Sequence, residues 1–404
     1  DSGEGSVTIG EIFVRIAAFS VLDVYTFRTF PAEILGGHVT FQARISDKPV
    51  LSQGDDIDVL VSLNQEGYDN HIGELRPGGV VLYDSETATP DRDADEHVLY
   101  AITVGELARS IGFTRGRNLI MIGAMVQLFG LPLDRAEQMV RRRLGRFKDL
   151  LPKNLEALAL GYNFAEENFT KRPPVYLEPP PEASTEGLVM TGNQALALGA
   201  IAAGCRVYAG YPITPATTIM EFLAKELPKV GGVVIQAEDE IAAINMAVGA
   251  SFSGVRAMTA TSGPGLSLMV EAMGLASMTE TPIVVVDVQR AGPATGMPTK
   301  TAQGDLYLAL YAGNDDPPRI VLAPSSVEDC FYQTINAFNL AERYQMPVIL
   351  LSDQALAPRV ETCPPFRLDD IQLFDREIAD VNGDGAYQRY KITETGVSPM
   401  TVPG

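Results

Sequence analysis

Four short segments combine glycine or proline turns with side chains suited to acid-base or anion-binding chemistry. They are Gly210-Tyr-Pro-Ile-Thr-Pro215, Gln236-Ala-Glu-Asp-Glu-Ile-Ala-Ala243, Thr261-Ser-Gly-Pro-Gly-Leu266 and Gln289-Arg-Ala-Gly-Pro-Ala-Thr-Gly-Met-Pro-Thr299. Together they place hydroxyl groups, a carboxylate and a guanidinium in turns. Such a set of groups suits a polar ligand.

Glu240 is the main candidate for acid-base chemistry. Taken alone, the triplet Glu238–Glu240 fits ordinary helix capping. Carboxylates in the first turn of a helix interact favourably with the positive end of its dipole and accept hydrogen bonds from its free N–H groups. Glu240 differs from its two neighbours in the helix face that it occupies. Ala243, Ile244 and Ala247 follow it at helical spacing and predict that this face is apolar. Burial on that face favours the protonated form of a carboxyl group. Such a group could share a proton with a ring nitrogen of a ligand.

Arg290 is the main candidate for binding a carboxylate, because a guanidinium can grip one through two parallel hydrogen bonds. Taken alone, an arginine in a loop more often forms an ordinary salt bridge. The unusual motif around Arg290 favours the ligand-binding alternative. All three histidines, His38, His71 and His97, lie far from this region in the sequence, which argues against an imidazole base there.

The elements that position these segments alternate regularly after residue 187. The pattern predicts helices at 192–203, 216–227, 241–250 and 327–344, and strands at 206–209, 232–236, 255–260, 282–288 and 348–351. Alternation of this kind is typical of a doubly wound parallel α/β sheet, whose ligands gather at the carboxyl ends of the strands. Each chemical segment follows a predicted strand, so we expect all four to meet at one edge of the sheet.

The rest of the chain predicts a second α/β domain ahead of this one. Strand-like runs at 59–63 and 80–83 and a helical segment at 131–160 support it. We predict a first domain at 1–170, a stiff proline-rich linker at 171–186, the doubly wound domain at 187–360 and an irregular extension at 361–404. The turn at Gly3–Ser6 normally follows a strand, so a first strand is expected to be missing. That turn could cradle a phosphate, although a lone glycine turn more often only permits tight packing.

Composition narrows the classes of function. The 404 residues are 46% hydrophobic and 20% charged, as in a globular protein of two or three domains, and no apolar run is long enough to span a membrane. A net charge of -20 disfavours nucleic acid and anionic lipid as partners. Cys205, Cys330 and Cys363 are too few and too widely spaced for a zinc or iron-sulfur motif, and their number suits a reducing compartment. We therefore expect a cytoplasmic protein that binds no metal by itself.

Three of the motifs together resemble the α subunit of 2-oxoglutarate:ferredoxin oxidoreductases. Tyr-Pro-Ile-Thr-Pro, Glu-Ile-Ala-Ala and the run from Gln289 to Thr299 stand in the order and spacing of that family. The likeness is strong over 187–360, whereas 1–170 resembles less specifically the γ-type domain fused ahead of it in many members. The resemblance implies a sheet of the thiamine-diphosphate pyrimidine-binding type.

The resemblance also implies cofactors, partners and roles for residues. Thiamine diphosphate would be shared with a β subunit that holds the diphosphate, Mg²⁺ and a [4Fe-4S] cluster, within an α2β2 heterotetramer that reduces ferredoxin. The glutamate matching Glu240 would bond the pyrimidine N1′ and favour the tautomer whose exocyclic nitrogen removes the thiazolium C2 proton. Pro212 and Thr214 would line the pyrimidine and the 2-oxo group, while Arg290 and Thr299 would bind the substrate carboxylate.

The implied reaction converts 2-oxoglutarate and coenzyme A to succinyl-CoA and CO2, or runs in reverse, with the contacts to coenzyme A unassigned. One alternative is a pyruvate or branched-chain 2-oxoacid enzyme, which Arg290 disfavours because it suits a dicarboxylate. A second alternative is a non-catalytic nucleotide-binding or scaffold module, although no Gly-x-Gly-x-x-Gly turn follows a predicted strand. Asn382–Gly385 is similar to the start of a thiamine magnesium motif, but too few residues follow it, so an ordinary turn is predicted.

Overall fold

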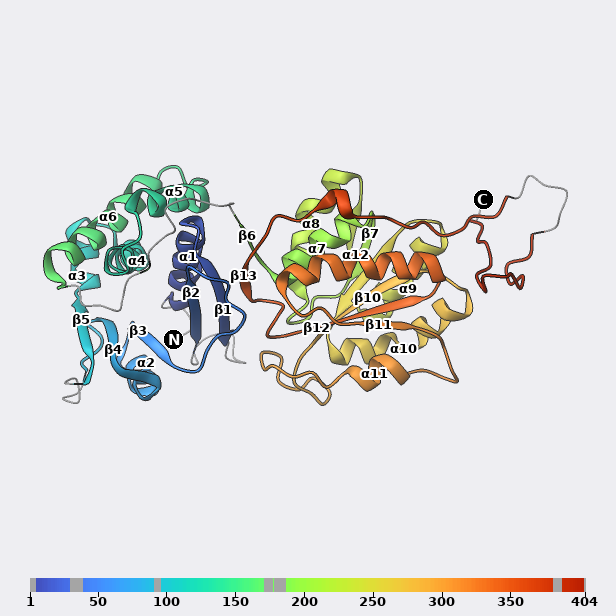
Figure 1. Cartoon of the computed structure of the whole chain (residues 1–404), viewed down its shortest axis with the longest axis horizontal. Coiled ribbons are helices and arrows are strands. Elements are labelled where there is room, and N and C mark those ends of the chain that lie inside the picture. Colours follow the sequence, from blue (N-terminus) through green and yellow to red (C-terminus); the bar gives the residue numbers. More distant parts are fainter. Residues whose placement is uncertain are drawn as a thin grey trace. The chain divides into compact units, whose positions relative to one another are not determined.

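The computed structural model describes residues 5–29, 39–90, 96–170, 177, 187–380 and 387–402. The chain forms two compact units (Figure 1). The first contains Asp1–Val189 and Val360–Pro365, and the second contains Met190–Arg359 and Phe366–Gly404. Three predicted features lie outside the described residues: the linker at 171–186 except Leu177, the start of the Gly3–Ser6 turn, and the turn at Asn382–Gly385.

A six-stranded parallel sheet forms the centre of the second unit, so the predicted doubly wound sheet is confirmed. The chain reverses direction across the sheet at β7, because β8 lies on one side of β7 and β9 on the other. Such a switch point is where open α/β sheets bind their ligands. The strands, in spatial order, are β11 (Ile320–Leu322), β12 (Pro347–Asp353), β10 (Ile283–Gln289), β9 (Ala257–Thr261), β7 (Val207–Gly210) and β8 (Val233–Gln236).

Helices cover both faces of this sheet (Figure 1). On one face pack α7 (Gly192–Ala202), α8 (Thr217–Glu226) and α12 (Val327–Tyr344). On the other pack α9 (Glu240–Phe252), α10 (Gly263–Met278) and α11 (Leu306–Tyr311). Every residue of β10 and β12 is buried, as expected for central strands of a parallel sheet with both faces covered.

The periodic elements of the second unit lie within a few residues of their predicted bounds, but α10, α11 and β11 had no prediction. The reason is clearest in α10. Exposed Leu268, Leu275 and Met278 alternate with buried apolar residues, so apolar side chains surround the helix and no 3.6-residue period stands out.

The first unit combines helices with two small sheets. One sheet is parallel and contains β3 (Ile57–Ser62), β4 (Leu75–Asp84) and β5 (Val98–Ile102). The other has the order β2-β1-β13-β6, in which β13 comes from the far end of the chain and pairs antiparallel with β1. The strands of this sheet are β1 (Asp23–Thr29), β2 (Thr40–Ser46), β13 (Val360–Cys363) and β6 (Leu188–Thr191), of which Met190 and Thr191 already belong to the second unit. The helices of the first unit are α1 (Ser6–Phe19), α2 (Gln65–His71), α3 (Val104–Ser110), α4 (Arg117–Leu128), α5 (Leu133–Leu144) and α6 (Leu151–Asn168).

The helical segment predicted at 131–160 contains two helices, α5 and α6, and the second continues beyond the predicted end. Helix α5 ends at Leu144 with Gly145 at its C-cap, and a turn closed by a Leu150 N–H to Phe147 O hydrogen bond separates it from α6. Pro152 then occupies the first turn of α6, where the missing N–H of proline has no intrahelical partner to lose.

Helices α4 and α6 cross at two glycines, and this contact predicts a large effect on stability. A methyl group on Gly161 would overlap Ile120 O, and one on Gly123 would overlap Leu158 O. We expect Gly161→Ala to lower the free energy of unfolding by about 2–3 kcal/mol, since the helix backbones must move apart. Urea unfolding would show a lower midpoint. Gly249→Ala on α9 is the control, because nothing lies within 4 Å of its added methyl group. Equal effects of the two changes would contradict this explanation.

The irregular segment after β13 is firmly attached to the second unit. The Arg376 guanidinium forms a bidentate ion pair with Glu342, at 2.7 Å from Nε to Oε2 and 2.6 Å from Nη2 to Oε1. Both side chains are 4% exposed. Arg376 Nη1 also donates to Ser251 O at 2.6 Å. Arg376 therefore fastens the chain around it to α9 and α12.

Candidate active site

The four chemical segments follow four neighbouring strands of the parallel sheet, β7, β8, β9 and β10. Because the strands are parallel, their carboxyl ends lie at one edge, and the loops that follow them meet there. This is also the side of the switch point beside β7. The expected meeting of the segments is thus a consequence of the sheet topology.

Glu240 is the first residue of α9 and is 6% exposed. The capping role belongs to its neighbour, because Asp239 Oδ1 accepts a hydrogen bond from Ala242 N at 2.7 Å. Glu238 is exposed. Of the three carboxylates, Glu240 alone is therefore buried, as the pattern of Ala243, Ile244 and Ala247 predicted.

Gly265 on α10 makes room for the Glu240 carboxyl group. A methyl group at Gly265 would lie 2.7 Å from Glu240 Oε1 and would overlap Thr261 Oγ1. The sequence Thr261-Ser-Gly-Pro-Gly-Leu266 indicates a turn, but it gives no partner for Gly265. The structure shows that this glycine allows α10 to approach the acidic side chain.

Arg290 fastens the loop after β10 to the loop after β7. Its Nη1 donates to Thr214 O at 2.7 Å and its Nη2 to Thr295 O at 2.8 Å. Both partners are backbone carbonyls. Arg290 therefore links two loops by hydrogen bonds, which differs from the ordinary salt bridge considered as the alternative. Burial lowers the pKa of Arg290, while the Glu240 carboxylate acts in the opposite direction.

The other predicted residues occupy the same two loops. Thr214 is exposed and precedes the cis peptide bond to Pro215, and Pro212 is half-buried. Thr299 is half-buried on the loop after β10, where the Ala291 N–H to Lys300 O hydrogen bond of 3.0 Å brings the two limbs of the loop together.

Asn193 supports the loop after β7, and the sequence did not indicate this. Its Nδ2 donates to Pro215 O at 2.9 Å and to Thr218 Oγ1 at 2.8 Å. The position of Asn193, two residues after the capping residue Thr191, suggests a role at the start of α7. The carbonyl that its side chain binds, Pro215 O, lies 22 residues away in the sequence.

Several buried polar atoms at this edge have no hydrogen-bond partner among the described residues. They include Arg290 Nε, Thr299 Oγ1 and Ser262 Oγ. Such groups are costly unless something satisfies them. A polar ligand at the carboxyl edge would supply acceptors and donors for them. No group of three or more His, Cys, Asp or Glu side chains in the described part of the chain is arranged to hold a metal ion.

Comparison with known proteins agrees with this geometry. Residues 198–394 match the family described as pyruvate flavodoxin/ferredoxin oxidoreductase, thiamine diphosphate-binding, and 1–164 match pyruvate ferredoxin/flavodoxin oxidoreductase. The 2-oxoacid:ferredoxin oxidoreductase subunit alpha of Sulfolobus sp is 33% identical over 461 residues, which cover all of this chain and 71% of that protein. The chain belongs to the 2-oxoacid:ferredoxin oxidoreductase α-subunit family.

Two further relatives of this α-subunit family member carry names that refer to 2-oxoglutarate. The 2-oxoglutarate oxidoreductase subunit KorA of Mycobacterium tuberculosis is 36% identical over 92% of this chain, which spans 61% of the length of that relative. The 2-oxoglutarate:ferredoxin oxidoreductase of Magnetococcus marinus, solved with 2-oxoglutarate, coenzyme A and succinyl-CoA bound, matches with a TM-score of 0.92 and 41% identity. That match covers 100% of this chain and 70% of the solved chain.

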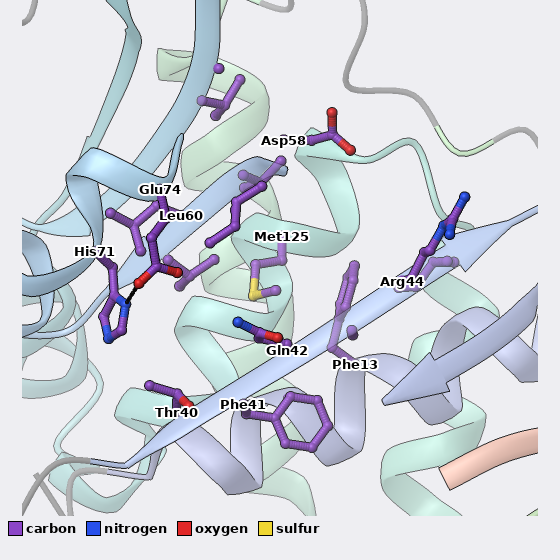
Figure 2. A pocket seen from close by; sticks show the side chains of 18 of the residues that line it. Phe13, Thr40, Phe41, Gln42, Arg44, Asp58, Leu60, His71, Glu74 and Met125 are labelled. Carbon is purple, nitrogen blue, oxygen red and sulfur yellow. Dashed lines mark hydrogen bonds and ion pairs between the residues drawn. The ribbon is translucent and has the colours of Figure 1, made fainter. Parts of the chain in front are cut away.

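The first unit of this α-subunit family member contains a cavity of about 830 Å³ (Figure 2). Phe13, Phe41 and Met125 contribute apolar side chains to its wall, and His71 Nδ1 lies 2.9 Å from Glu74 Oε1. All lining residues belong to 6–177, so the cavity contains none of the four segments at the sheet edge. It is not part of the candidate active site.

None of the helices that the structure describes is both long and apolar enough to cross a bilayer.

Proposed function

We propose that this chain is the α subunit of a thiamine-diphosphate-dependent 2-oxoglutarate:ferredoxin oxidoreductase. With a β subunit it would convert 2-oxoglutarate and coenzyme A to succinyl-CoA and CO2, or catalyse the reverse. The observation that carries the proposal is the buried carboxyl group of Glu240, which begins α9 at the carboxyl edge of the sheet. At the same edge Arg290 links the loop after β10 to the loop after β7.

The residues at this edge fit the aminopyrimidine end of thiamine diphosphate. Glu240 is buried without being used as the helix cap, and Gly265 leaves space beside its carboxyl group. When bound, the cofactor supplies the carbon nucleophile that attacks a 2-oxo group. Glu240 would hold a proton at the pyrimidine N1′. Pro212 and Thr214 would form the wall beside the ring.

The substrate carboxylate would be bound by Arg290 and Thr299. Arg290 Nε and Thr299 Oγ1 are both buried donors without a partner among the described residues, so a carboxylate between the two limbs of the loop would satisfy both. This arrangement favours a dicarboxylate over pyruvate or a branched-chain 2-oxo acid, which remain the alternative substrates. The names and bound ligands of the relatives support the same choice.

The proposed partners bind the parts of the cofactor that this chain does not. A β subunit would hold the cofactor diphosphate, Mg²⁺ and a [4Fe-4S] cluster in an α2β2 assembly, and the electrons would pass from the cluster to ferredoxin. Support comes from the relatives, which are named as subunits. We place the complex in the cytoplasm, because the odd number of cysteines, three in all, suits a reducing compartment.

The proposal is tested by co-purifying the chain with its β partner and following reduction of a viologen dye. Reduction should require 2-oxoglutarate, coenzyme A and thiamine diphosphate together, and pyruvate or 2-oxoisovalerate should support little of it. Equal rates with pyruvate would contradict the assignment of 2-oxoglutarate as the substrate, but not the assignment to this class of enzyme. Inactivity with every plausible β partner would favour the non-catalytic scaffold alternative.

Gly265→Ala is expected to reduce turnover in this assay. The added methyl group must displace Glu240 or Thr261, because it would lie 2.7 Å from Glu240 Oε1. We expect kcat to fall by about 10- to 100-fold, since a small displacement of a catalytic group is costly. Gly274→Ala in the same helix has nothing within 4 Å of its added methyl group and serves as the matched control. A fully active Gly265→Ala complex would exclude close packing of α10 against Glu240.

A further inference from the structure

Asp287 is a buried acid that the proposed chemistry does not use. It lies on β10, three residues before Arg290, and is 0% exposed. Neither of its carboxyl oxygens accepts a hydrogen bond from an N–H or hydroxyl group of the described residues. An ionised carboxyl group in such a place is strongly disfavoured, so Asp287 needs either a proton or a partner that shares one.

Asp305 provides that partner at the opposite end of the loop. It precedes α11, and its N–H donates to Gln289 Oε1 at 3.1 Å. Burial raises the pKa of Asp287 well above its ordinary value, and both the charge of Asp305 and a side-chain hydrogen bond with it raise that pKa further. Asp305 Oδ2, like both carboxyl oxygens of Asp287, is buried without a hydrogen-bond partner among the described residues. Asp287 and Gln289 are two residues apart on β10 and share one face of the sheet, and Asp305 bonds to Gln289, so the two carboxyl groups meet on that face.

The shared proton belongs on Asp287. Asp305 is only half-buried, and a methyl group on Gly263, the first residue of α10, would lie 2.9 Å from Asp305 Oδ2. The positive end of that 16-residue helix stabilises negative charge on Asp305. Burial raises the pKa of Asp305, but the hydrogen bond from Asp287 acts in the opposite direction. Asp287 is thus the donor and Asp305 the acceptor.

The other charged groups around this pair are engaged elsewhere. Asp353 on β12 accepts from Gln303 Nε2 at 2.6 Å and from two backbone N–H groups. Arg290 donates to two carbonyls, and Glu240 lies against Gly265 of α10. Lys300 is exposed. The charge that acts on Asp287 is that of Asp305.

We propose that protonated Asp287 donates a hydrogen bond to the Asp305 carboxylate and thereby closes the base of the loop at 290–304, which makes Asp287 a positioning residue for substrate binding. The loop carries Arg290 and Thr299, so the consequence for substrate rests on the proposed function. Two other bonds hold the same base, Gln289 with Asp305 and Gln303 with Asp353. The acid pair differs from them because it requires a proton.

The pair gives the loop a dependence on pH. Because folding raises the pKa of Asp287, the folded chain binds a proton that the unfolded chain has already released, and stability falls as pH rises towards the raised value. Once both carboxyl groups are ionised they repel each other across the base of the loop. The KM for 2-oxoglutarate should then increase as pH rises through the raised pKa of Asp287, more than kcat changes.

Two substitutions of similar size separate the hydrogen bond from simple packing. Asp287→Asn keeps a donor that needs no titration, whereas Asp287→Val removes it. We expect Asp287→Val to raise the KM for 2-oxoglutarate by about 10-fold with kcat within about 3-fold, and Asp287→Asn to stay within about 3-fold in both. The Asp287→Asn complex should also lose the increase in KM with rising pH. Indistinguishable behaviour of the two variants would overturn the proposal.

Hydrogen exchange of the loop at 290–304 gives a readout that does not depend on activity. Exchange should be faster in Asp287→Val than in the wild-type complex, and close to wild type in Asp287→Asn. If the wild-type complex proves inactive on 2-oxoglutarate, the proposed function fails while this measurement still decides the role of the pair. If Asp287→Val does not fold, the wild type and Asp287→Asn are compared across pH. Identical profiles of exchange would refute the shared proton.

Discussion

Replacement of Glu240 by alanine is expected to abolish turnover of the complex with its β subunit, lowering kcat by about 10²- to 10⁴-fold. Glu240 is the buried acid at the carboxyl edge of the sheet, while the neighbouring Asp239 caps the helix. Alanine removes the group that would hold the proton at the pyrimidine nitrogen. Dye reduction with 2-oxoglutarate and coenzyme A measures the loss.

Two variants make this result specific. Glu238→Ala removes an exposed carboxylate two residues away and should leave kcat unchanged. Glu240→Gln keeps the size of the side chain and can still hydrogen-bond, but it cannot exchange a proton, so its activity should remain close to that of Glu240→Ala. Full activity of either Glu240 variant, in a complex that melts at the wild-type temperature, would remove Glu240 from the mechanism.

Replacement of Arg290 by methionine is expected to lower kcat/KM for 2-oxoglutarate by about 100-fold, as loss of a buried charged partner for a carboxylate usually does. The side chain is 6% exposed, and its Nε has no partner among the described residues. Pyruvate lacks the second carboxylate, so kcat/KM for pyruvate should fall much less. The measured quantity is the ratio of the two values of kcat/KM.

The ratio matters because Arg290 also supports two loops. Its bonds to Thr214 O and Thr295 O are lost in the same variant, and this would slow both substrates alike. An unchanged ratio would mean that Arg290 only positions the loops. Lys300→Met removes an exposed cation from the same loop and should not change the ratio. The comparison therefore separates charge recognition from loop support.

Local patterns predicted a large part of the second unit. Helix α12 and strand β10 were predicted because a single helical period or apolar run defines each of them. The distinction between Asp239 and Glu240 was also local, since it depends on which residues follow at helical spacing. In contrast, β13 joins a sheet of the first unit more than three hundred residues after β1, and no local pattern indicates such a pairing.

The sequence by itself determined the α/β alternation, the family and the set of polar groups at the strand ends, because each of these is written in spacing along the chain. Only the tertiary structure decided which groups touch: Gly265 beside Glu240, Arg290 on the carbonyl of Thr214, and Asp305 on the side chain of Gln289. The physical reason is that parallel strands bring loops from distant parts of the chain to one edge, where packing between helices fixes the contacts.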